Sequence, residues 1–314
     1  MSQSVTFRPP VPPEAVTKQS RKASRPARSQ TAAGAWMVAP AVVLMATFVI
    51  IPIALTFTLA FTNAQLISPE PIKFIGFDNF TRLFQDSTFW KSLRNTIIFA
   101  VVVVPVQAGL ALGLALLINV KIRGVNFFRT VYFLPVVTSM VVVSMLWLFM
   151  YNKAGLFNSV LSKIGITGPD WLTDTHTALA AIIVMSIWQA VGFHMIVWLS
   201  GLQTISPSLY EASSLDGATG WQQFRFVTWP GLKQTRTFIL ITITIGALGL
   251  FTQINIMTQG GPLDSTSTLV YQAVRAGFAQ QQTGFSSAIA LVFFVLVLAI
   301  SLVQRYLTRD KEAR

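Results

Sequence analysis

The sequence predicts an all-α polytopic membrane protein with six transmembrane helices and a cytoplasmic loop between the fourth and the fifth. Of its 314 residues, 53% are hydrophobic and only 11% are charged, a balance that soluble domains of this size do not usually have. The hydrophobic residues also gather in six runs without Asp, Glu, Lys or Arg. Each run is at least as long as the ~20 residues that a helix needs to cross the hydrocarbon of a bilayer.

The six runs define the domain organisation. Residues 1–34 are rich in proline, serine, arginine and lysine, and we expect them to form a disordered basic cytoplasmic tail. The run that follows is too long for the ~7 to 15 residue core of a signal peptide, so it predicts the first span. The predicted spans are 35–62, 95–119, 130–151, 178–203, 237–258 and 285–304, within one membrane domain of residues 35–308 that is followed by a short cytoplasmic tail, 309–314.

Lysine and arginine predict the orientation. If the amino terminus is cytoplasmic, the inner segments carry more than twice as many Lys and Arg residues as the outer loops. This positive-inside asymmetry predicts that both termini are cytoplasmic. Nucleic-acid binding is the competing interpretation of the net charge of +12. The basic residues form no stripe with interleaved aromatic residues, so we expect no nucleic-acid partner.

A short helix is predicted in the first outer loop. Phe77, Phe80, Leu83 and Phe84 recur at helical spacing among charged residues, which is typical of an amphipathic helix at the outer interface. It could cover the ends of other helices, or it could form part of a docking surface for an external partner.

The residues that are missing from the sequence exclude several classes of site. There is no cysteine, so a disulfide framework and a thiolate metal site are excluded. The two histidines, His176 and His194, fall in an outer loop and in a span, and we expect no metal site. Ion-coupled carriers commonly place ionisable residues inside the bilayer, and none occurs in the six runs. An ion-coupled secondary carrier is therefore the weaker alternative for a transport function.

The loop at 204–236 contains several residues that are typical of the starts and ends of helices. Ser206 followed by proline predicts the start of a short helix, and Gly217 predicts its end in a left-handed conformation. Thr219 and Gln222 match a capping box, so a second short helix should begin at once. A flexible linker would need none of these signals, which indicates a functional contact.

The same loop resembles the EAA signature of the permease subunits of bacterial ABC importers. The resemblance rests on Glu211-Ala212, on Gly217 six residues after the glutamate, and on Val227-x-Trp229-Pro230, where Pro230 is expected to end the second short helix. Two residues depart from the signature: Ser213 stands where alanine is usual, and Trp229 where an aliphatic residue precedes the proline.

Other segments extend the resemblance to the carbohydrate-uptake, maltose-type branch of that family. They occur in the order usual for the branch and cover nearly the whole membrane part: Asp78-Asn79-Phe80, Arg129-Thr-Val-Tyr-Phe-Leu-Pro135, Trp188-Gln189, Leu209 to Ala218, and Thr258-Gln-Gly-Gly-Pro262. The resemblance implies an importer permease in the bacterial cytoplasmic (inner) membrane for a sugar, an oligosaccharide or a glycerophosphate-like solute.

The resemblance also implies partners. They are a second permease subunit, expected to be a different chain, two ATP-binding subunits, an extracytoplasmic solute-binding protein and membrane lipid. No Gly-Lys dipeptide occurs in the sequence, so it holds no phosphate-binding loop of the Walker type. We therefore expect no cofactor in this chain, with ATP and Mg bound by the partner ATPase subunits.

In that family the EAA loop is a coupling helix that sits in a cleft of the ATPase subunit. The resemblance assigns this contact to Glu211, Ala212, Ser213, Asp216, Gly217, Ala218, Trp221 and Phe224. Trp221 and Phe224 could anchor in the ATPase cleft or pack on the membrane domain.

Polar and aromatic residues inside the spans are candidates for the substrate path. An amide beside an aromatic ring suits a sugar, because the ring stacks on C–H groups while the amide bonds hydroxyls. In the fifth span, Thr242, Gly246, Gly249 and Gln253 project on one face, and we expect the two glycines to serve helix packing. The candidates are Gln189 and Phe193 in the fourth span and Phe251, Thr252, Gln253 and Asn255 in the fifth.

Overall fold

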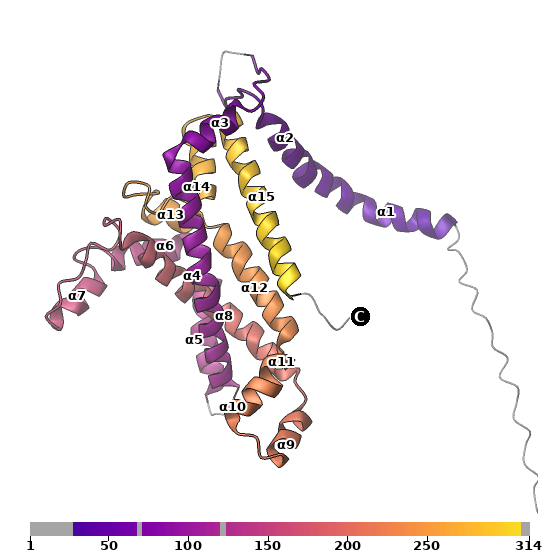
Figure 1. Ribbon diagram of the computed structural model, residues 1–314, viewed down its shortest axis with the longest axis vertical. Helices are drawn as coiled ribbons and strands as arrows, with labels where there is room; N and C mark the ends of the chain where they lie inside the picture. The colour runs from indigo at the N-terminus through magenta and orange to yellow at the C-terminus, as the bar shows by residue number, and fades with distance from the viewer. Residues whose placement is uncertain (1–27, 68–70, 120–123, 309–314) are drawn as a thin grey trace, which may run out of the picture. The chain divides into compact units, whose positions relative to one another are not determined.

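Helices make up almost all of the chain in the computed structural model, which describes residues 28–67, 71–119 and 124–308 (Figure 1). Five helices of the described chain are long and apolar enough to cross a membrane, and one bent helix pair brings the number of possible spans to six. No strand occurs in these residues apart from an isolated bridge between Thr62 and Phe74. The predicted fold class is therefore confirmed. The predicted tails lie outside the described residues, except for 28–34.

The chain divides into two units, Met1–Ile53 and Ala54–Arg314. The first unit holds α1 (Arg28–Met45), a π-helical turn, η1 (Ala46–Ile50), and the start of α2 (Ile51–Leu59). The prediction of a disordered tail up to residue 34 is wrong at its end, because α1 already begins at Arg28. No proline stands between Pro26 and Pro40, and the alanines after Arg28 favour a helix.

The short amphipathic helix of the first outer loop is present as α3 (Asp78–Gln85). Leu83 on its apolar face is fully buried. Asn79 donates from Nδ2 to the carbonyl oxygens of Ala60 and Thr62, both at 2.9 Å. The helix therefore covers the carbonyl groups that follow the end of α2, which was one of its two predicted roles.

The centre of the second unit is α8 (Ala178–Gln203), which has the bounds predicted for the fourth span. It packs against α4 (Ser87–Ile118), α5 (Val125–Val137) and α12 (Lys233–Leu248). The largest fully buried side chain, Trp198, lies in this core and donates from Nε1 to the carbonyl of Ala108 at 3.1 Å. An indole buried in this way must find an acceptor, and α4 supplies it.

The third predicted span, 130–151, is not one straight helix. Its two parts, α5 and α6 (Met140–Met150), meet at an angle of 98°. Thr138 and Ser139 adopt extended backbone between them, and Pro135 lacks the N–H that would continue the helical hydrogen bonds of α5. The sequence pattern showed an unbroken apolar run and so concealed the bend.

The fifth predicted span is also interrupted. α12 ends at Leu248, and a separate short helix, α13 (Thr252–Met257), follows after Gly249 to Phe251. The sixth span is α15 (Thr283–Thr308). Three further elements lie in the loops: α7 (Leu156–Lys163), α14 (Leu269–Val274) and the π-helical turn η3 (Arg275–Ala279).

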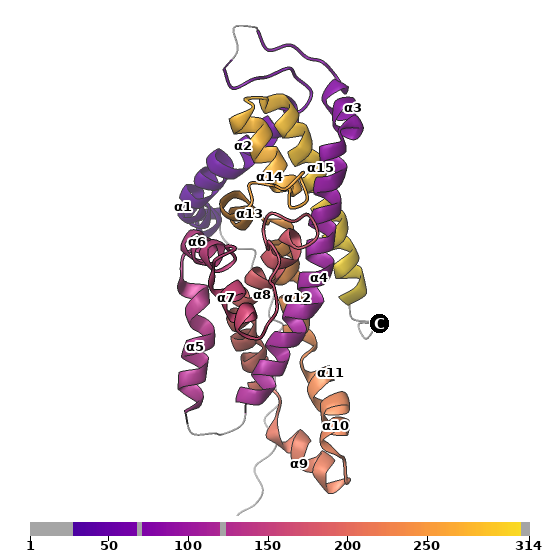
Figure 2. The ribbon, with the colours of Figure 1, turned by 90° about the vertical axis from the view of Figure 1, so that its left-hand side faces the viewer.

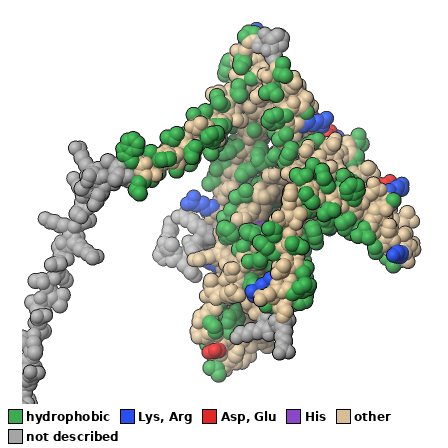
Figure 3. Space-filling model, turned by 180° about the vertical axis from the view of Figure 1, so that it is seen from behind, with side chains coloured by type: hydrophobic (Ala, Val, Ile, Leu, Met, Phe, Trp, Pro, Cys, Tyr) green, Lys and Arg blue, Asp and Glu red, His purple; other side chains and the backbone are tan. Residues whose placement is uncertain are grey.

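The two ends of the second unit carry different elements. In Figures 1 and 2, α9 (Pro207–Leu215) and α10 (Gly220–Gln223) lie at one end, and α3 and α14 lie at the opposite end. Between them, hydrophobic side chains cover much of the face seen in Figure 3. This distribution is that of a chain surrounded by lipid and by other membrane helices.

Candidate functional site

The first candidate site is the 204–236 loop, whose first helix follows the sequence signals. α9 begins directly after Ser206, with Pro207 at its first position. The Ser206 hydroxyl does not cap the helix but lies 2.8 Å from the Ser208 hydroxyl. Gly217 has φ of +74° and ends the helix, and the N–H of Ala218 donates back to the carbonyl of Ser213 at 2.9 Å. The predicted glycine stop is confirmed.

The second helix of the loop, α10, starts with the predicted capping box. The Thr219 N–H donates to Gln222 Oε1 at 2.7 Å, and the Gln222 N–H donates to Thr219 Oγ1 at 3.4 Å. The helix runs on through a π-helical turn, η2 (Phe224–Thr228), into α11 (Trp229–Gly231). It ends at Gly231, one residue after Pro230, which is close to the predicted end.

Hydrogen bonds join the two short helices into one body. The hydroxyls of Tyr210 and Thr228 lie 2.9 Å apart, and Gln223 Nε2 donates to the Ser214 hydroxyl at 2.8 Å. Ser213 donates to the carbonyl of Tyr210 at 2.8 Å, so its hydroxyl is used inside α9. The departure from alanine at this position therefore places no unpaired polar group on the surface.

The loop presents a mixed surface to its surroundings. Leu215 is 91% exposed and Trp221 is 69% exposed, and Glu211, Ala212, Asp216 and Gly217 are exposed as well. Phe224 and Ala218 are half-buried, and Phe224 packs against the main hydrophobic core. The rings of Phe224 and Trp221 are stacked, with 5.5 Å between their centroids. Of the two aromatic residues, Phe224 anchors the loop to the membrane domain and Trp221 faces outward.

The second candidate site is a cavity of about 200 Å³ between α4, α6, α8, α12 and α13, with a mainly apolar lining into which several polar side chains are set. Six of its lining side chains carry hydrogen-bonding groups and none is Asp, Glu, Lys or Arg: Gln107, Ser186, Gln189, His194, Thr242 and Gln253. A Cβ atom added at Gly246, which also lines the cavity, would meet nothing within 4 Å. At Gly249 a Cβ atom would meet only the carbonyl oxygens of Ile245 and Gly246 in its own helix. The packing role predicted for the two glycines is therefore wrong within this chain.

The polar groups of the cavity are only partly satisfied. The amide of Gln107 and Nδ1 of His194 lie 2.8 Å apart, and Gln189 Nε2 donates to the carbonyl of Pro135 at 3.4 Å. Ser186 Oγ is buried without a partner among the described residues. Because a buried hydroxyl without a partner is costly, this group is available for a ligand.

The predicted path residues divide between this cavity and other places. Gln189 and Gln253 line the cavity. Phe193, Phe251, Thr252 and Asn255 lie outside its lining, and a role for them in the path stays a prediction. Gln107 was missed, because a single amide in an apolar run carries no signal until its partner, His194, is brought beside it by the packing of α4 on α8.

Comparison with known proteins places the chain in a family. The family described as "Binding-protein-dependent transport system inner membrane component" matches residues 106–312. The chain is 37% identical over 284 residues to the lactose transport system permease protein LacF of Rhizobium radiobacter, covering 88% of this chain and 94% of LacF. It is 34% identical over 278 residues to the sulfoquinovosyl glycerol transport system permease protein SmoG of Agrobacterium fabrum, covering 88% of this chain and 90% of SmoG.

A solved structure shares the fold over the same extent. It is a chain of a bacterial ABC transporter involved in the import of the acidic polysaccharide alginate, with a TM-score of 0.80 and 25% identity, covering 90% of this chain and 99% of that chain. A second structure of the alginate transporter, in complex with an alginate pentasaccharide-bound periplasmic protein, matches with a TM-score of 0.78. The chain belongs to the binding-protein-dependent transport system inner membrane components, the permease subunits of ABC importers.

Proposed function

We propose that this permease forms half of the translocation path for a neutral sugar or oligosaccharide that an external solute-binding protein delivers. The relatives LacF and SmoG are named for sugar-containing solutes, and an alginate importer shares the fold. The cavity between α4, α6, α8, α12 and α13 carries the main support, because the amide and hydroxyl groups set in its mainly apolar lining suit sugar hydroxyls. Its lining has no cationic side chain, so a neutral sugar fits better than a glycerophosphate.

The energy for transport is proposed to enter through the 204–236 loop. Leu209, Leu215 and Trp221 are large apolar side chains exposed on α9 and α10, which is typical of a protein contact. Phe224 packs this surface against the core of the membrane domain, and the Tyr210–Thr228 hydrogen bond joins the two halves of the loop. A partner ATPase subunit seated on α9 and α10 would therefore move the spans when it closes on ATP.

The proposed assembly has a second, different permease chain and two ATP-binding subunits, which hold ATP and Mg and carry out hydrolysis. Both termini of this chain lie on the cytoplasmic side in this proposal, since the distribution of Lys and Arg favours that orientation. The 204–236 loop then also lies on the cytoplasmic side, where it can meet the ATPases.

Reconstitution into proteoliposomes tests the function. The chain is incorporated with its partner permease and ATPase subunits, the solute-binding protein is added outside with a radiolabelled sugar, and uptake is measured with and without ATP inside. We expect uptake that requires ATP, both permeases and the binding protein, and that persists when ionophores collapse ion gradients. Uptake by this chain alone that ionophores abolish would establish an ion-coupled secondary carrier instead.

A further inference from the structure

A pocket of about 660 Å³ lies between the end of α4, the start of α5, the end of α8 and the start of α9. It is at the end of the second unit that carries the 204–236 loop (Figure 2). Its volume is in the range of sites for small molecules. The lining combines apolar side chains with two charged ones, Arg129 and Glu211.

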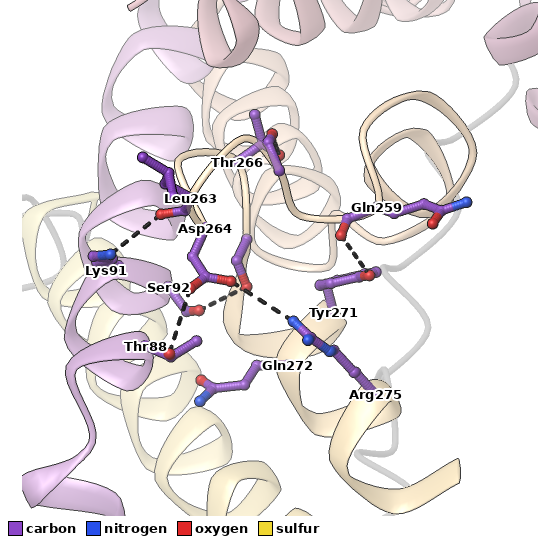
Figure 4. Close-up of polar contacts among 12 residues, drawn as sticks. Thr88, Lys91, Ser92, Gln259, Leu263, Asp264, Thr266, Tyr271, Gln272 and Arg275 are labelled. Carbon is purple, nitrogen blue, oxygen red and sulfur yellow. Dashed lines mark hydrogen bonds and ion pairs between the residues drawn. The ribbon is translucent and has the colours of Figure 1, made fainter. Parts of the chain in front are cut away.

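The charge of Arg129 has no partner among the described residues. Its Nε is buried and makes no hydrogen bond, and neither ion pair of the described chain involves it. By contrast, Arg275 at the opposite end of the unit pairs with Asp264 at 3.7 Å, beside the bond from Lys91 to the Leu263 carbonyl (Figure 4). A buried donor without an acceptor is costly, so Arg129 indicates a ligand with an anionic group.

The start of α5 adds to the positive potential around Arg129. Gly124 precedes the helix, no side chain caps its first N–H groups, and its first turn holds no acidic residue. Free N–H groups at the start of a helix attract anions, together with the helix dipole. Val125 in the first turn and Arg129 one turn later both line the pocket, so the two contributions meet there.

Glu211 places a negative charge in the lining of the same pocket. Its side chain is exposed, and it forms no ion pair with Arg129 or with any other residue of the described chain. Two opposite charges therefore line one pocket without neutralising each other. Such a pocket suits a ligand that carries an anionic group and, separately, a cationic group.

The pocket lies at the depth of lipid headgroups. Asn119 and Gln203 of its lining end the predicted second and fourth spans, and Arg129 directly precedes the third. The apolar part of a membrane helix ends where the hydrocarbon gives way to headgroups. An anionic group that reaches Arg129 therefore lies at the same depth as the phosphates of the surrounding lipid.

Exposed apolar side chains beside the pocket favour a lipid over a solute from water. Phe127 is 68% exposed and Phe128 is 46% exposed, and both stand between the lining residues Val125 and Arg129. Leu117, near the end of α4, is also 68% exposed. These side chains can pack on the glycerol and the acyl chains of a lipid whose headgroup enters the pocket.

We infer that this pocket binds the headgroup of a zwitterionic phospholipid with a primary ammonium group, such as phosphatidylethanolamine. The phosphate accepts hydrogen bonds from Arg129, and the ammonium donates to Glu211 on α9, which lies beyond the start of α5 in Figure 2. A choline headgroup has no N–H to donate, and a glycerol headgroup has no positive charge. The orientation in the proposed function places this lipid in the cytoplasmic leaflet.

The lipid leaves most of the coupling surface free. Of the residues expected to contact the ATPase subunit, only Glu211 lines this pocket. The bound headgroup would connect α5 with α9 and so help to hold the 204–236 loop on the membrane domain.

Photolabelling locates the lipid without relying on transport. The complete transporter is purified in detergent, stripped of lipid and mixed with phosphatidylethanolamine that carries a diazirine in an acyl chain near the glycerol. After illumination and digestion, we expect mass spectrometry to find adducts in α5 around Phe127 and Phe128. R129Q should reduce their yield about tenfold, through the loss of charge-assisted hydrogen bonds, and R129K should recover part of it.

The matched control is R225Q, which removes an exposed arginine of η2 outside the pocket. Its labelling yield should equal that of the wild type. Equal yields in R129Q and R225Q would overturn the inference. If R129K labels as poorly as R129Q, the charge at this position is not what binds the lipid.

Competition identifies the headgroup. Unlabelled phosphatidylethanolamine should displace the probe at a concentration about tenfold lower than phosphatidylcholine or phosphatidylglycerol, and E211Q should remove this preference. A preference that persists in E211Q would contradict the contact with the ammonium. Phosphoethanolamine and inorganic phosphate lack acyl chains and should compete poorly. If either competes as well as the lipid, the occupant is a soluble phosphate compound and the lipid assignment fails.

A charge swap separates the lipid from a direct pair between Arg129 and Glu211 in another position of the loop. R129E/E211R keeps such a pair but places a negative charge at the depth of the phosphate. We expect this variant to label as poorly as R129Q, and added phosphatidylethanolamine to raise the unfolding temperature of the wild type only. Two single variants that are destabilised without lipid, and a swap that restores the wild-type unfolding temperature, would show a direct pair and overturn the inference. None of these outcomes depends on transport, so failure of the lipid site leaves the proposed function intact.

Discussion

The hydroxyl of Tyr210 in α9 lies 2.9 Å from the hydroxyl of Thr228, the last residue of η2. The two residues come from the two halves of the 204–236 loop, on either side of Gly217. Thr228 is buried, and Tyr210 is half-buried against the main hydrophobic core. A force applied to the exposed tip of α9 therefore reaches the segment that leads into α12 through this contact, as well as through the backbone.

Removing the Tyr210 hydroxyl should weaken the coupling of ATP hydrolysis to transport. Y210F keeps the ring packed and removes one hydrogen bond, worth about 1 kcal/mol. We expect assembly and ATPase activity to persist while the sugar transported per ATP hydrolysed falls severalfold. Y306F, at a tyrosine that is 78% exposed in α15, is the control. An unchanged transport ratio in Y210F would exclude this contact as a route for the force.

A substitution at Gly217 should loosen α9 locally. An alanine Cβ there would meet nothing within 4 Å, so the effect comes from the backbone alone, at φ of +74°. Alanine in this conformation is less stable by about 1 to 2 kcal/mol. We expect amide hydrogen exchange in α9, followed by mass spectrometry, to accelerate about 5- to 30-fold in G217A.

The matched control for this measurement is G220A. Gly220 lies in the same loop, also has open space around its Cβ position, and has no left-handed backbone conformation. Exchange in α9 should therefore stay at the wild-type rate in G220A. Equal acceleration in the two variants would show that the loop responds to any added side chain and that the hinge conformation is not what matters.

The hydrogen bond between Gln107 and His194 should stabilise the membrane core. Q107L leaves the His194 imidazole buried without this partner, which costs about 1 to 3 kcal/mol. We expect a lower melting temperature for the detergent-solubilised chain. The double variant Q107L/H194F replaces both polar groups and should recover part of the loss, so a thermodynamic cycle gives a favourable coupling energy. Strictly additive effects would show that the two side chains are not coupled.

The sequence predicted the 204–236 loop in detail because its signals are local. Thr219 and Gln222 are three residues apart and Gly217 acts through its own backbone, so no distant partner is needed to interpret them. The end predicted at Pro230 is one residue short, since the helix ends at Gly231. The bend between α5 and α6 was missed. A run of apolar residues predicts that a segment lies in the membrane, but it does not predict whether the helix is straight.

The cavity could be predicted only in part. Helical periodicity placed Thr242, Gly246, Gly249 and Gln253 together, and three of the four line the cavity. Gly249 does not, because α12 ends just before it and the helix breaks there. The residues of the other wall lie on α4 and α8. Which of their side chains face the cavity depends on how these two helices pack against each other. The packing of α5 on α8 likewise depends on Gly192, which carries no signal in the apolar run of its span.

Gly192 should be intolerant of any side chain. A Cβ atom there would overlap the backbone carbonyl of Tyr132 in α5, and backbone cannot move aside as the end of a flexible side chain can. We therefore expect G192A to separate α5 from α8, with a loss of about 1 to 3 kcal/mol in stability. Thermal unfolding of the purified chain measures this loss. G109A adds the same methyl group in α4, where nothing lies within 4 Å, and should unfold like the wild type. If G192A is as stable as G109A, the approach of the two helices is looser than the structure has it.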